Sequence, residues 1–70
     1  MARVFVRSSN VEWVEYSPDT NNLDVEFRGG GTYRYTRVPT HVYQALLSAP
    51  SKGKFLNEHV KPHFHCDKLR

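Results

Sequence analysis

The clearest pattern of apolar and polar positions lies at residues 23–28, where every second residue is apolar and the residues between them are charged. Alternation with a period of two is typical of a strand that buries one face. The preceding residues 17–22 are rich in Pro, Asn and Asp, and three glycines follow at 29–31, so a turn is predicted on each side. The inward side chains of this strand are predicted to be Leu23, Val25 and Phe27.

Two further strands are predicted, one on each side of the first along the chain. Residues 11–16 are mainly β-branched or aromatic. Within them Val11 and Trp13 break the alternation, which requires either a bulge or partial cover on both faces. Residues 32–38 predict the third strand, which Pro39 ends because proline cannot donate a ladder hydrogen bond. One face of this strand is predicted to carry Tyr33, Tyr35 and Arg37.

The apolar residues then change to a helical spacing. Residues 40–48 carry an apolar stripe and predict a helix with Thr40 as its N-cap. Pro50 ends this helix, and residues 52–60 repeat the spacing and predict a second helix with Ser51 as its N-cap. The two stripes consist of Val42, Tyr43, Leu46 and Leu47 in the first helix and of Phe55, Leu56, His59 and Val60 in the second.

Three strands followed by two helices predict an α+β fold, in which a three-stranded antiparallel β-meander is followed by two short helices packed on one face. At 70 residues the chain is expected to form a single domain, 1–70, with one modest core. Residues 1–8 and 63–70 carry no sustained pattern and are expected to be loosely ordered ends. A core of this size rarely supplies more than about 3–5 kcal/mol of net stability, which favours a binding surface over a preorganised active site.

The charges are unevenly distributed along the chain, whose formal net charge is +3. Residues 1–31 carry three arginines against five carboxylates, whereas residues 32–70 carry seven lysines and arginines against two carboxylates. A partner with negative charge is therefore expected to bind the second half. Because there is one cysteine, no cleavable leader and no membrane-length apolar run, we expect a soluble protein of the reducing cytoplasm.

Several segments are characteristic in their order and spacing. They are Ser8-Ser9-Asn10-Val11, Val14 with Tyr16, Leu23-Asp24-Val25-Glu26-Phe27, Tyr33-Arg34-Tyr35, Val38-Pro39, Val42-Tyr43, Leu46-Leu47 and Ser51-Lys52-Gly53-Lys54-Phe55-Leu56-Asn57. Together they resemble the KTSC domain, a small module at the C-terminus of some lysyl-tRNA synthetases that also stands alone in bacteria and phages. The resemblance covers residues 8–64, with departures at Trp13, Glu15 and Leu56. It implies an α+β fold and, through the synthetase connection, RNA binding.

An aromatic and basic stretch in the third strand is the first candidate binding site. Tyr33 and Tyr35 share a strand face and stand about 7 Å apart, a separation that suits the stacking of bases from a single-stranded nucleic acid. Arg34 and Arg37 add positive charge. The alternative is that both tyrosines belong to the core beneath the helices, in which case Arg34 faces solvent on a surface of mixed charge.

The start of the second helix is the second candidate site. Free backbone N–H groups, the Ser51 hydroxyl and the side chains of Lys52 and Lys54 would suit a phosphate or a carboxylate. Gly53 would let a ligand or a neighbouring backbone approach closely. The alternative is an ordinary capped helix with solvated lysines. Lys61, which follows this helix, extends the basic surface.

Histidines gather near the end of the sequence at His59, His63 and His65, and Cys66 follows them. Imidazole and thiolate are good zinc ligands, but Pro62 interrupts the helix, so we expect no metal site, with His59 on the inner helix face and the other histidines in solvent. A Cys66 nucleophile would need an electropositive pocket that a loose tail does not supply. We therefore expect no catalytic residue.

These features favour a non-catalytic binding module without a cofactor. The expected partner is RNA or single-stranded nucleic acid, bound by the basic second half of the chain. The residues expected to make the contacts are Tyr33, Arg34, Tyr35, Arg37, Ser51, Lys52, Lys54 and Lys61. The alternative is a protein-interaction module, such as a small phage or bacterial accessory protein that docks on a host protein by its helix pair or an exposed strand edge.

Overall fold

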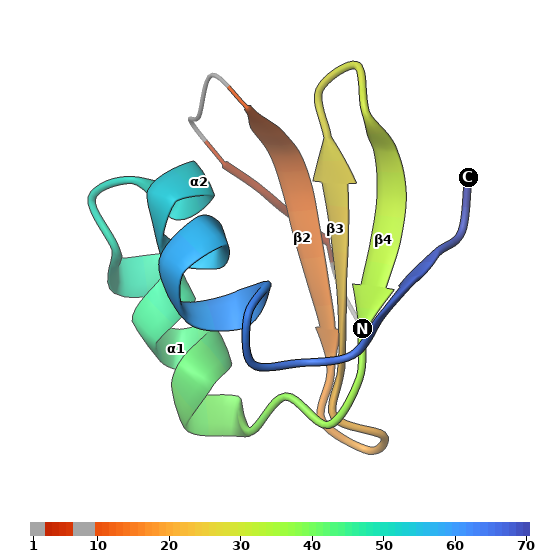
Figure 1. The fold of residues 1–70 in the computed structure, drawn as a ribbon. Helices are drawn as coiled ribbons and strands as arrows, with labels where there is room; N and C mark the ends of the chain where they lie inside the picture. Colours follow the sequence, from red (N-terminus) through yellow and green to blue (C-terminus); the bar gives the residue numbers. More distant parts are fainter. Residues whose placement is uncertain (1–2, 7–9) are drawn as a thin grey trace.

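The computed structural model describes residues 3–6 and 10–70, and within them one five-stranded antiparallel sheet lies against a layer of helices (Figure 1). The strands follow one another across the sheet in chain order. The elements are β1 (Arg3–Phe5), β2 (Val11–Ser17), β3 (Asn22–Phe27), β4 (Gly31–Tyr35), α1 (Thr40–Ser48), α2 (Lys52–Phe55), η1 (Leu56–Val60) and β5 (Cys66–Lys68). The predicted α+β fold, with a meander packed on one face by helices, is confirmed.

The sheet has two strands beyond the three predicted, and both lie in segments that were expected to be loose ends. β1 pairs with β2, and β5 pairs with β4. Strands of three residues are too short to display an alternating pattern, so each depends on the longer strand beside it. The expectation of loose ends is therefore wrong for Arg3–Phe5 and for Cys66–Lys68. Residues 1–2 and 7–8 of the expected lead-in lie outside the described residues.

The register of the sheet places the predicted inward residues in the core. Leu23 and Val25 are fully buried. Between Val11 and Trp13 the pairing of β2 with β3 shifts, so a bulge is present. As a result Val11 is buried beneath the helices, whereas Trp13 is buried on the other face, where the Arg3 guanidinium lies 4.0 Å from the centroid of the indole ring.

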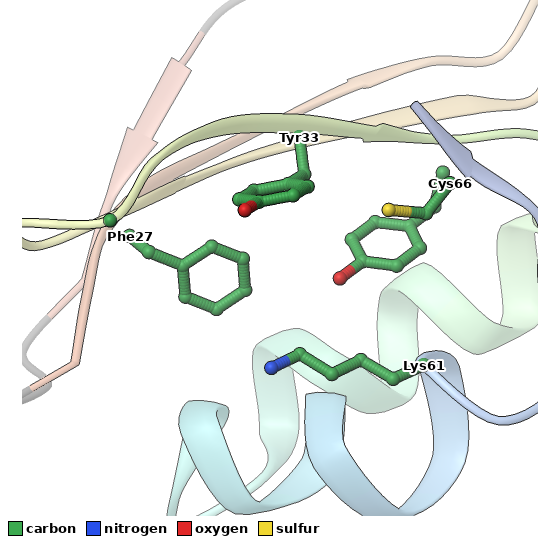
Figure 2. Close-up of a pocket in the computed structure, with 6 residues that line it drawn as sticks. Phe27, Tyr33, Lys61 and Cys66 are labelled. Carbon is green, nitrogen blue, oxygen red and sulfur yellow. The ribbon is translucent and has the colours of Figure 1, made fainter. Parts of the chain in front are cut away.

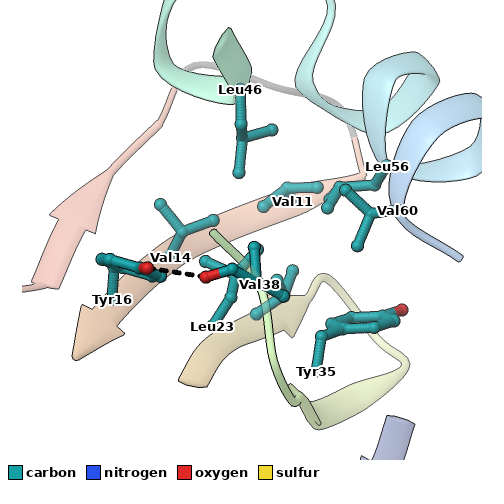
Figure 3. Packing of buried hydrophobic residues seen from close by; sticks show 10 residues of the cluster. Val11, Val14, Tyr16, Leu23, Tyr35, Val38, Leu46, Leu56 and Val60 are labelled. Carbon is teal, nitrogen blue, oxygen red and sulfur yellow. Dashed lines mark hydrogen bonds between the residues drawn. The ribbon is translucent and has the colours of Figure 1, made fainter. Parts of the chain in front are cut away.

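The strand β4 ends at Tyr35, three residues before the predicted end. Arg37 adopts a positive φ of 58°, and the chain turns there so that the N–H of Val38 donates to the carbonyl of Asn21 at 2.8 Å. Val38 is buried, and its carbonyl accepts a 2.6 Å hydrogen bond from the Tyr16 hydroxyl (Figure 3). The predicted common face of Tyr35 and Arg37 is wrong, because a left-handed residue interrupts the alternation.

The helix α1 begins at the predicted residue but is not capped by it. Pro39 occupies the cap position and makes no side-chain cap hydrogen bond, while Thr40 Oγ1 lies 3.3 Å from the Tyr16 hydroxyl. Leu46 is the buried residue of α1. The ring of Tyr43 stacks on that of Tyr16, with centroids 4.6 Å apart. The side chains of Leu46 and Tyr43 therefore attach α1 to the sheet.

The second predicted helix is present as two parts of different pitch. Ser51 caps α2 as predicted, because its hydroxyl accepts from the N–H of Lys54 at 3.3 Å. A π-helical turn, η1, follows and is closed by a 2.8 Å hydrogen bond from the N–H of Lys61 to the carbonyl of Leu56. Such a turn holds one more residue than an α-helical turn. It keeps Leu56 and Val60 in the core.

Candidate functional site: an open groove on the inner face of the sheet

The helices cover part of the inner face of the sheet, and the rest of that face lines a groove (Figure 2). Leu23 and Tyr35 are buried, whereas Phe27 and Tyr33, which lie on the same face nearer the glycine turn, remain partly exposed. The pocket between these rings and the end of η1 has a volume of about 420 Å³. We refer to it as the aromatic groove, and its lining consists of Phe27, Gly30, Tyr33, Tyr35, Lys61 and Cys66.

Two aromatic rings at the mouth of the aromatic groove fix each other in place. The centroids of Phe27 and Tyr33 are 5.6 Å apart, and the ring planes are inclined at 75°, an edge-to-face arrangement that favours a single orientation of each ring. Tyr33 lies opposite Val25 in the strand ladder, and Phe27 lies opposite Gly31. In Figure 2 the Tyr33 ring is turned toward Phe27, and Lys61 reaches toward the Phe27 ring from the helix side. The groove therefore presents aromatic surface from rigid backbone positions.

Two lysines bring positive charge to these rings from different elements. The Nζ of Lys61 lies 4.8 Å from the centroid of Phe27, and the Nζ of Lys68 lies 5.9 Å from the centroid of Tyr33. Lys68 reaches Tyr33 because the two residues are partners in the pairing of β4 with β5. In the part of the chain that the structure describes, neither ammonium forms an ion pair with a carboxylate. Both charges are therefore available to an anionic ligand.

The floor of the aromatic groove is formed by the ring of Tyr35, which is 2% exposed. Burial is the largest of the effects that raise the pKa of Tyr35 to about 12, and the neighbouring Cys66 thiol adds to it. The phenol is therefore neutral near pH 7 and stays a hydrogen-bond donor.

The ionisation of Tyr35 is expected to make the domain less stable at alkaline pH. An unfolded tyrosine loses its proton near 10.0, whereas the pKa of folded Tyr35 is about 12. Because the folded-state value is raised, its contribution to the unfolding free energy is complete below pH 10.0 and is lost as the pH rises toward 12. Urea unfolding at several pH values measures this slope.

A matched pair of variants assigns the slope to Tyr35. Tyr35→Phe is expected to reduce it, whereas Tyr43→Phe is expected to leave the contribution of Tyr35 in place. Tyr43, whose pKa is also raised by burial, is expected to contribute to the slope that remains in Tyr35→Phe. An identical slope in Tyr35→Phe and the wild-type chain would contradict the assignment.

Comparison with known proteins gives matches that cover most of the chain. The KTSC domain family matches residues 7–64. The chain belongs to this family. The fold of this KTSC domain is similar to that of a KTSC domain protein from Yersinia pestis known from a crystal structure, with a TM-score of 0.95 and 39% identity over 99% of this chain and 97% of that chain. The resemblance inferred from the sequence is confirmed.

Two further relatives show the settings in which the KTSC domain occurs. An uncharacterized protein of Stutzerimonas stutzeri is 45% identical over 62 residues, which make up 89% of this chain and 87% of that protein. A lysine–tRNA ligase of a Nostoc species is 36% identical over 61 residues, 87% of this chain but 11% of the ligase. The KTSC domain is thus a small module that is also found as a minor part of a synthetase.

The structure of the KTSC domain brings three of the predicted binding residues together, namely Tyr33, Tyr35 and Lys61. The two alternatives considered for the tyrosines each describe one of them. Tyr35 is a core residue that supplies the floor, and Tyr33 is a partly exposed residue that supplies a wall. Of the pair, Tyr33 is therefore the residue whose ring remains partly open to solvent.

The two predicted arginines lie away from the aromatic groove. Arg34 lies on the opposite face of the sheet, where its Nε and Nη2 donate to the Asp24 carboxylate at 2.8 and 3.0 Å. The same hydrogen bond is the main effect that raises the pKa of Arg34. Arg37 borders a neighbouring pocket of about 310 Å³, which is lined by Thr36, Arg37, His63, Phe64 and His65.

The predicted anion site at the start of α2 also lies outside the lining of the aromatic groove. Its three side chains have different surroundings: Ser51 caps α2, and Lys54 is exposed. The ammonium of Lys52 donates to the carbonyls of Leu47 and Ala49 at 3.0 and 2.7 Å. Lys52 therefore satisfies carbonyl groups at the end of α1, which favours the alternative of an ordinary capped helix for this residue.

Besides Gly30 of the glycine turn, three residues of the site were not predicted from the sequence as binding residues. Phe27 was expected in the core, because alternation identifies the inward face but does not indicate where the helices stop covering it. Cys66 and Lys68 lie on β5, and a three-residue strand gives no periodic signal. The excess of positive charge in the second half of the chain was the only indication in the sequence for Lys68.

The histidines considered as possible metal ligands have different surroundings. His59 is exposed, and its ring contacts that of Phe55 in a tilted arrangement with centroids 4.9 Å apart. The prediction of an inward His59 is therefore wrong. The π-helical turn has Leu56 and Val60 as its buried residues. His65 lies 3.1 Å from Asp67. Among residues 3–6 and 10–70, no group of three or more His, Cys, Asp or Glu is placed to hold a metal, and no helix is long and apolar enough to cross a membrane.

Proposed function

We propose that this KTSC domain is a non-catalytic binding module that contacts RNA or single-stranded nucleic acid through the aromatic groove. The observation that carries the proposal is the partly exposed Tyr33 ring, set beside Phe27 and flanked by the ammonium groups of Lys61 and Lys68. Single-stranded nucleic acids are bound by this combination of aromatic faces and positive charge.

The two parts of the groove would act on two parts of a nucleotide. A base that stacks on Tyr33 gains about 1–3 kcal/mol, with little dependence on its identity. Lys61 and Lys68 would attract the adjoining phosphates, and each contact releases a counterion. Support also comes from relatives that contain this domain, since a lysine–tRNA ligase is by its name a protein that acts on an RNA.

A binding role without catalysis agrees with the surroundings of Cys66. The thiol lies in the aromatic groove beside the Tyr35 hydroxyl, while the neighbouring His65 ring faces Asp67. The cysteine and the histidine are thus engaged separately, and a nucleophile needs its base within hydrogen-bond reach.

Polarisation of a labelled single-stranded RNA, titrated at several salt concentrations, tests the proposal. For two phosphate contacts, the slope of log affinity against log salt is expected to be about −1.4. Tyr33→Ala is expected to weaken binding by about 1–3 kcal/mol, and Lys61→Ala to reduce the slope by about 0.7.

Lys54→Ala is the matched control, because it removes the same charge from an exposed site at the other end of α2 and η1. It is expected to have the smaller effect on binding. A larger effect for Lys54→Ala than for Lys61→Ala would move the binding site to the start of α2, where the sequence also suggested it. Absence of binding at low salt would leave the alternative of a protein partner, whose docking on an apolar surface depends little on salt.

A further inference from the structure

The aromatic groove continues past Phe27 into a second pocket of about 250 Å³. Phe27 and Lys61 line both pockets, so the two hollows meet at these residues. We refer to the second hollow as the amide pocket. Its lining consists of Asn10, Phe27, Arg28, Gly53, Asn57 and Lys61.

The amide pocket joins four elements at fixed positions. The N–H of Arg28 donates to the carbonyl of Asn10 at 2.8 Å, which ties the start of β2 to the end of β3. On the helix side, a Cβ at Gly53 would lie 3.2 Å from Asn10 Nδ2. The Asn10 amide therefore packs against α2 at a place where any side chain larger than hydrogen would press on it. Asn57 comes from η1 and is exposed.

The two pockets differ in chemistry. The aromatic groove offers ring faces, whereas the amide pocket offers the carbonyl oxygen and NH₂ groups of two asparagines. Amide groups of this kind form hydrogen bonds with the edges of nucleobases. Among the described residues no carboxylate lines either pocket, and the positively charged Lys61 lies where the two pockets meet.

We propose that the two pockets bind adjacent nucleotides of one strand. One base stacks on Tyr33 in the aromatic groove, and the linking phosphate lies at Lys61. The edge of the next base is hydrogen-bonded by Asn57 in the amide pocket, with the Asn10 side chain as a wall of that pocket. The smallest complete ligand is then a dinucleotide. This inference rests on the proposed function, because it names the ligand of the same groove.

A comparison of short ligands tests the inference directly. The probes are uridine 5′-monophosphate, the ribodinucleotide UpU and the deoxydinucleotide dTpdT, each titrated into the labelled domain and followed by NMR. UpU is expected to shift the side-chain amide signals of both asparagines together with the ring signals of Tyr33, whereas the mononucleotide shifts those of Tyr33 alone. Comparison of UpU with dTpdT decides whether RNA or single-stranded DNA is the preferred source of the strand.

Two variants separate the amide pocket from the rest of the groove. Asn57→Ala is expected to weaken UpU binding about two- to tenfold, the range for one lost hydrogen bond, and to leave mononucleotide binding unchanged within about twofold. Gly53→Ala is expected to act in the same direction by displacing Asn10. Gln44→Ala, which removes an exposed amide from α1, is the control and is expected to change neither affinity.

The possible outcomes distinguish this inference from the proposed function. If the wild-type domain binds the longer single-stranded RNA but binds UpU no more tightly than the mononucleotide, this inference is overturned and the proposed function stands. If it binds none of these ligands at low salt, both are overturned. If Tyr33→Ala abolishes binding while Asn57→Ala and Gly53→Ala bind UpU as the wild type does, the groove is a nucleotide site but the amide pocket takes no part. Equal losses for UpU and the mononucleotide in Asn57→Ala would also overturn the assignment of a second nucleotide.

Discussion

Replacement of Leu46 by alanine is expected to lower the free energy of unfolding by about 2–5 kcal/mol. Leu46 is fully buried, and it is the residue through which α1 enters the core. Truncation removes apolar contacts and leaves a cavity that the strands beneath are too rigid to fill. Since small domains have only about 3–5 kcal/mol of net stability, a large part of the Leu46→Ala population is expected to be unfolded at room temperature.

Urea unfolding followed by the fluorescence of Trp13 measures this loss, because the indole is 7% exposed when folded and lies on the opposite face of the sheet. Leu47→Ala is the matched control. The Leu47 side chain is 37% exposed, so the same truncation one residue later is expected to change the unfolding free energy by less than about 1 kcal/mol. Equal losses in the two variants would contradict the packing of α1 described above.

Replacement of Gly31 by alanine is expected to lower the free energy of unfolding by about 2–4 kcal/mol, through backbone strain and lost hydrogen bonds. Gly31 has a φ of 93°, which L-residues rarely adopt, and an added Cβ would overlap the carbonyl oxygen of Arg70. That carbonyl accepts from the N–H of Thr32 at 3.2 Å, and the N–H of Leu69 donates to the Thr32 carbonyl at 2.7 Å. The segment that follows β5 must therefore move.

Gly29→Ala separates the two causes, because Gly29 also has a positive φ, 75°, but an added Cβ would meet nothing within 4 Å. It is expected to cost only the strain, about 1–2 kcal/mol. Hydrogen exchange of the Leu69 amide is expected to accelerate in Gly31→Ala and to change little in Gly29→Ala. If the exchange rates and stabilities of the two variants are the same, contact with the Arg70 carbonyl has no energetic role.

The longer elements of the fold were predictable from the sequence because each carries its own pattern. The alternation of Leu23, Val25 and Phe27 depends on β3 alone, and all three face the helix side of the sheet. The early end of β4 was not predictable, because the left-handed Arg37 is neither glycine nor asparagine and gives no local signal. β1 and β5 are three-residue strands that depend on pairing with a longer strand, and for β5 that partner, β4, precedes the helices in the chain. A pattern of three residues does not record such pairing.

The candidate site was predictable only in part for a similar reason. Composition indicated the aromatic and basic character of Tyr33 and Lys61. It did not separate them from Arg34, which the pleat of the strand sends to the other face and Asp24 neutralises. Lys52 likewise has the composition of an anion ligand but serves the end of α1. The use of a charged side chain is decided by its nearest partners, and these come from other elements.

The direction of Lys61 is encoded in the length of the backbone before it. Each residue of an α-helix turns the chain by about 100°, and the extra residue held in η1 therefore resets the angle of everything that follows. Loss of one residue from η1 would restore an ordinary turn with a complete set of backbone hydrogen bonds, yet swing the next side chain away from Phe27. The extra residue in η1 thus sets the direction of the Lys61 side chain. In a related chain that has a lysine at this position but a continuous α-helix, the lysine side chain is expected to point in another direction.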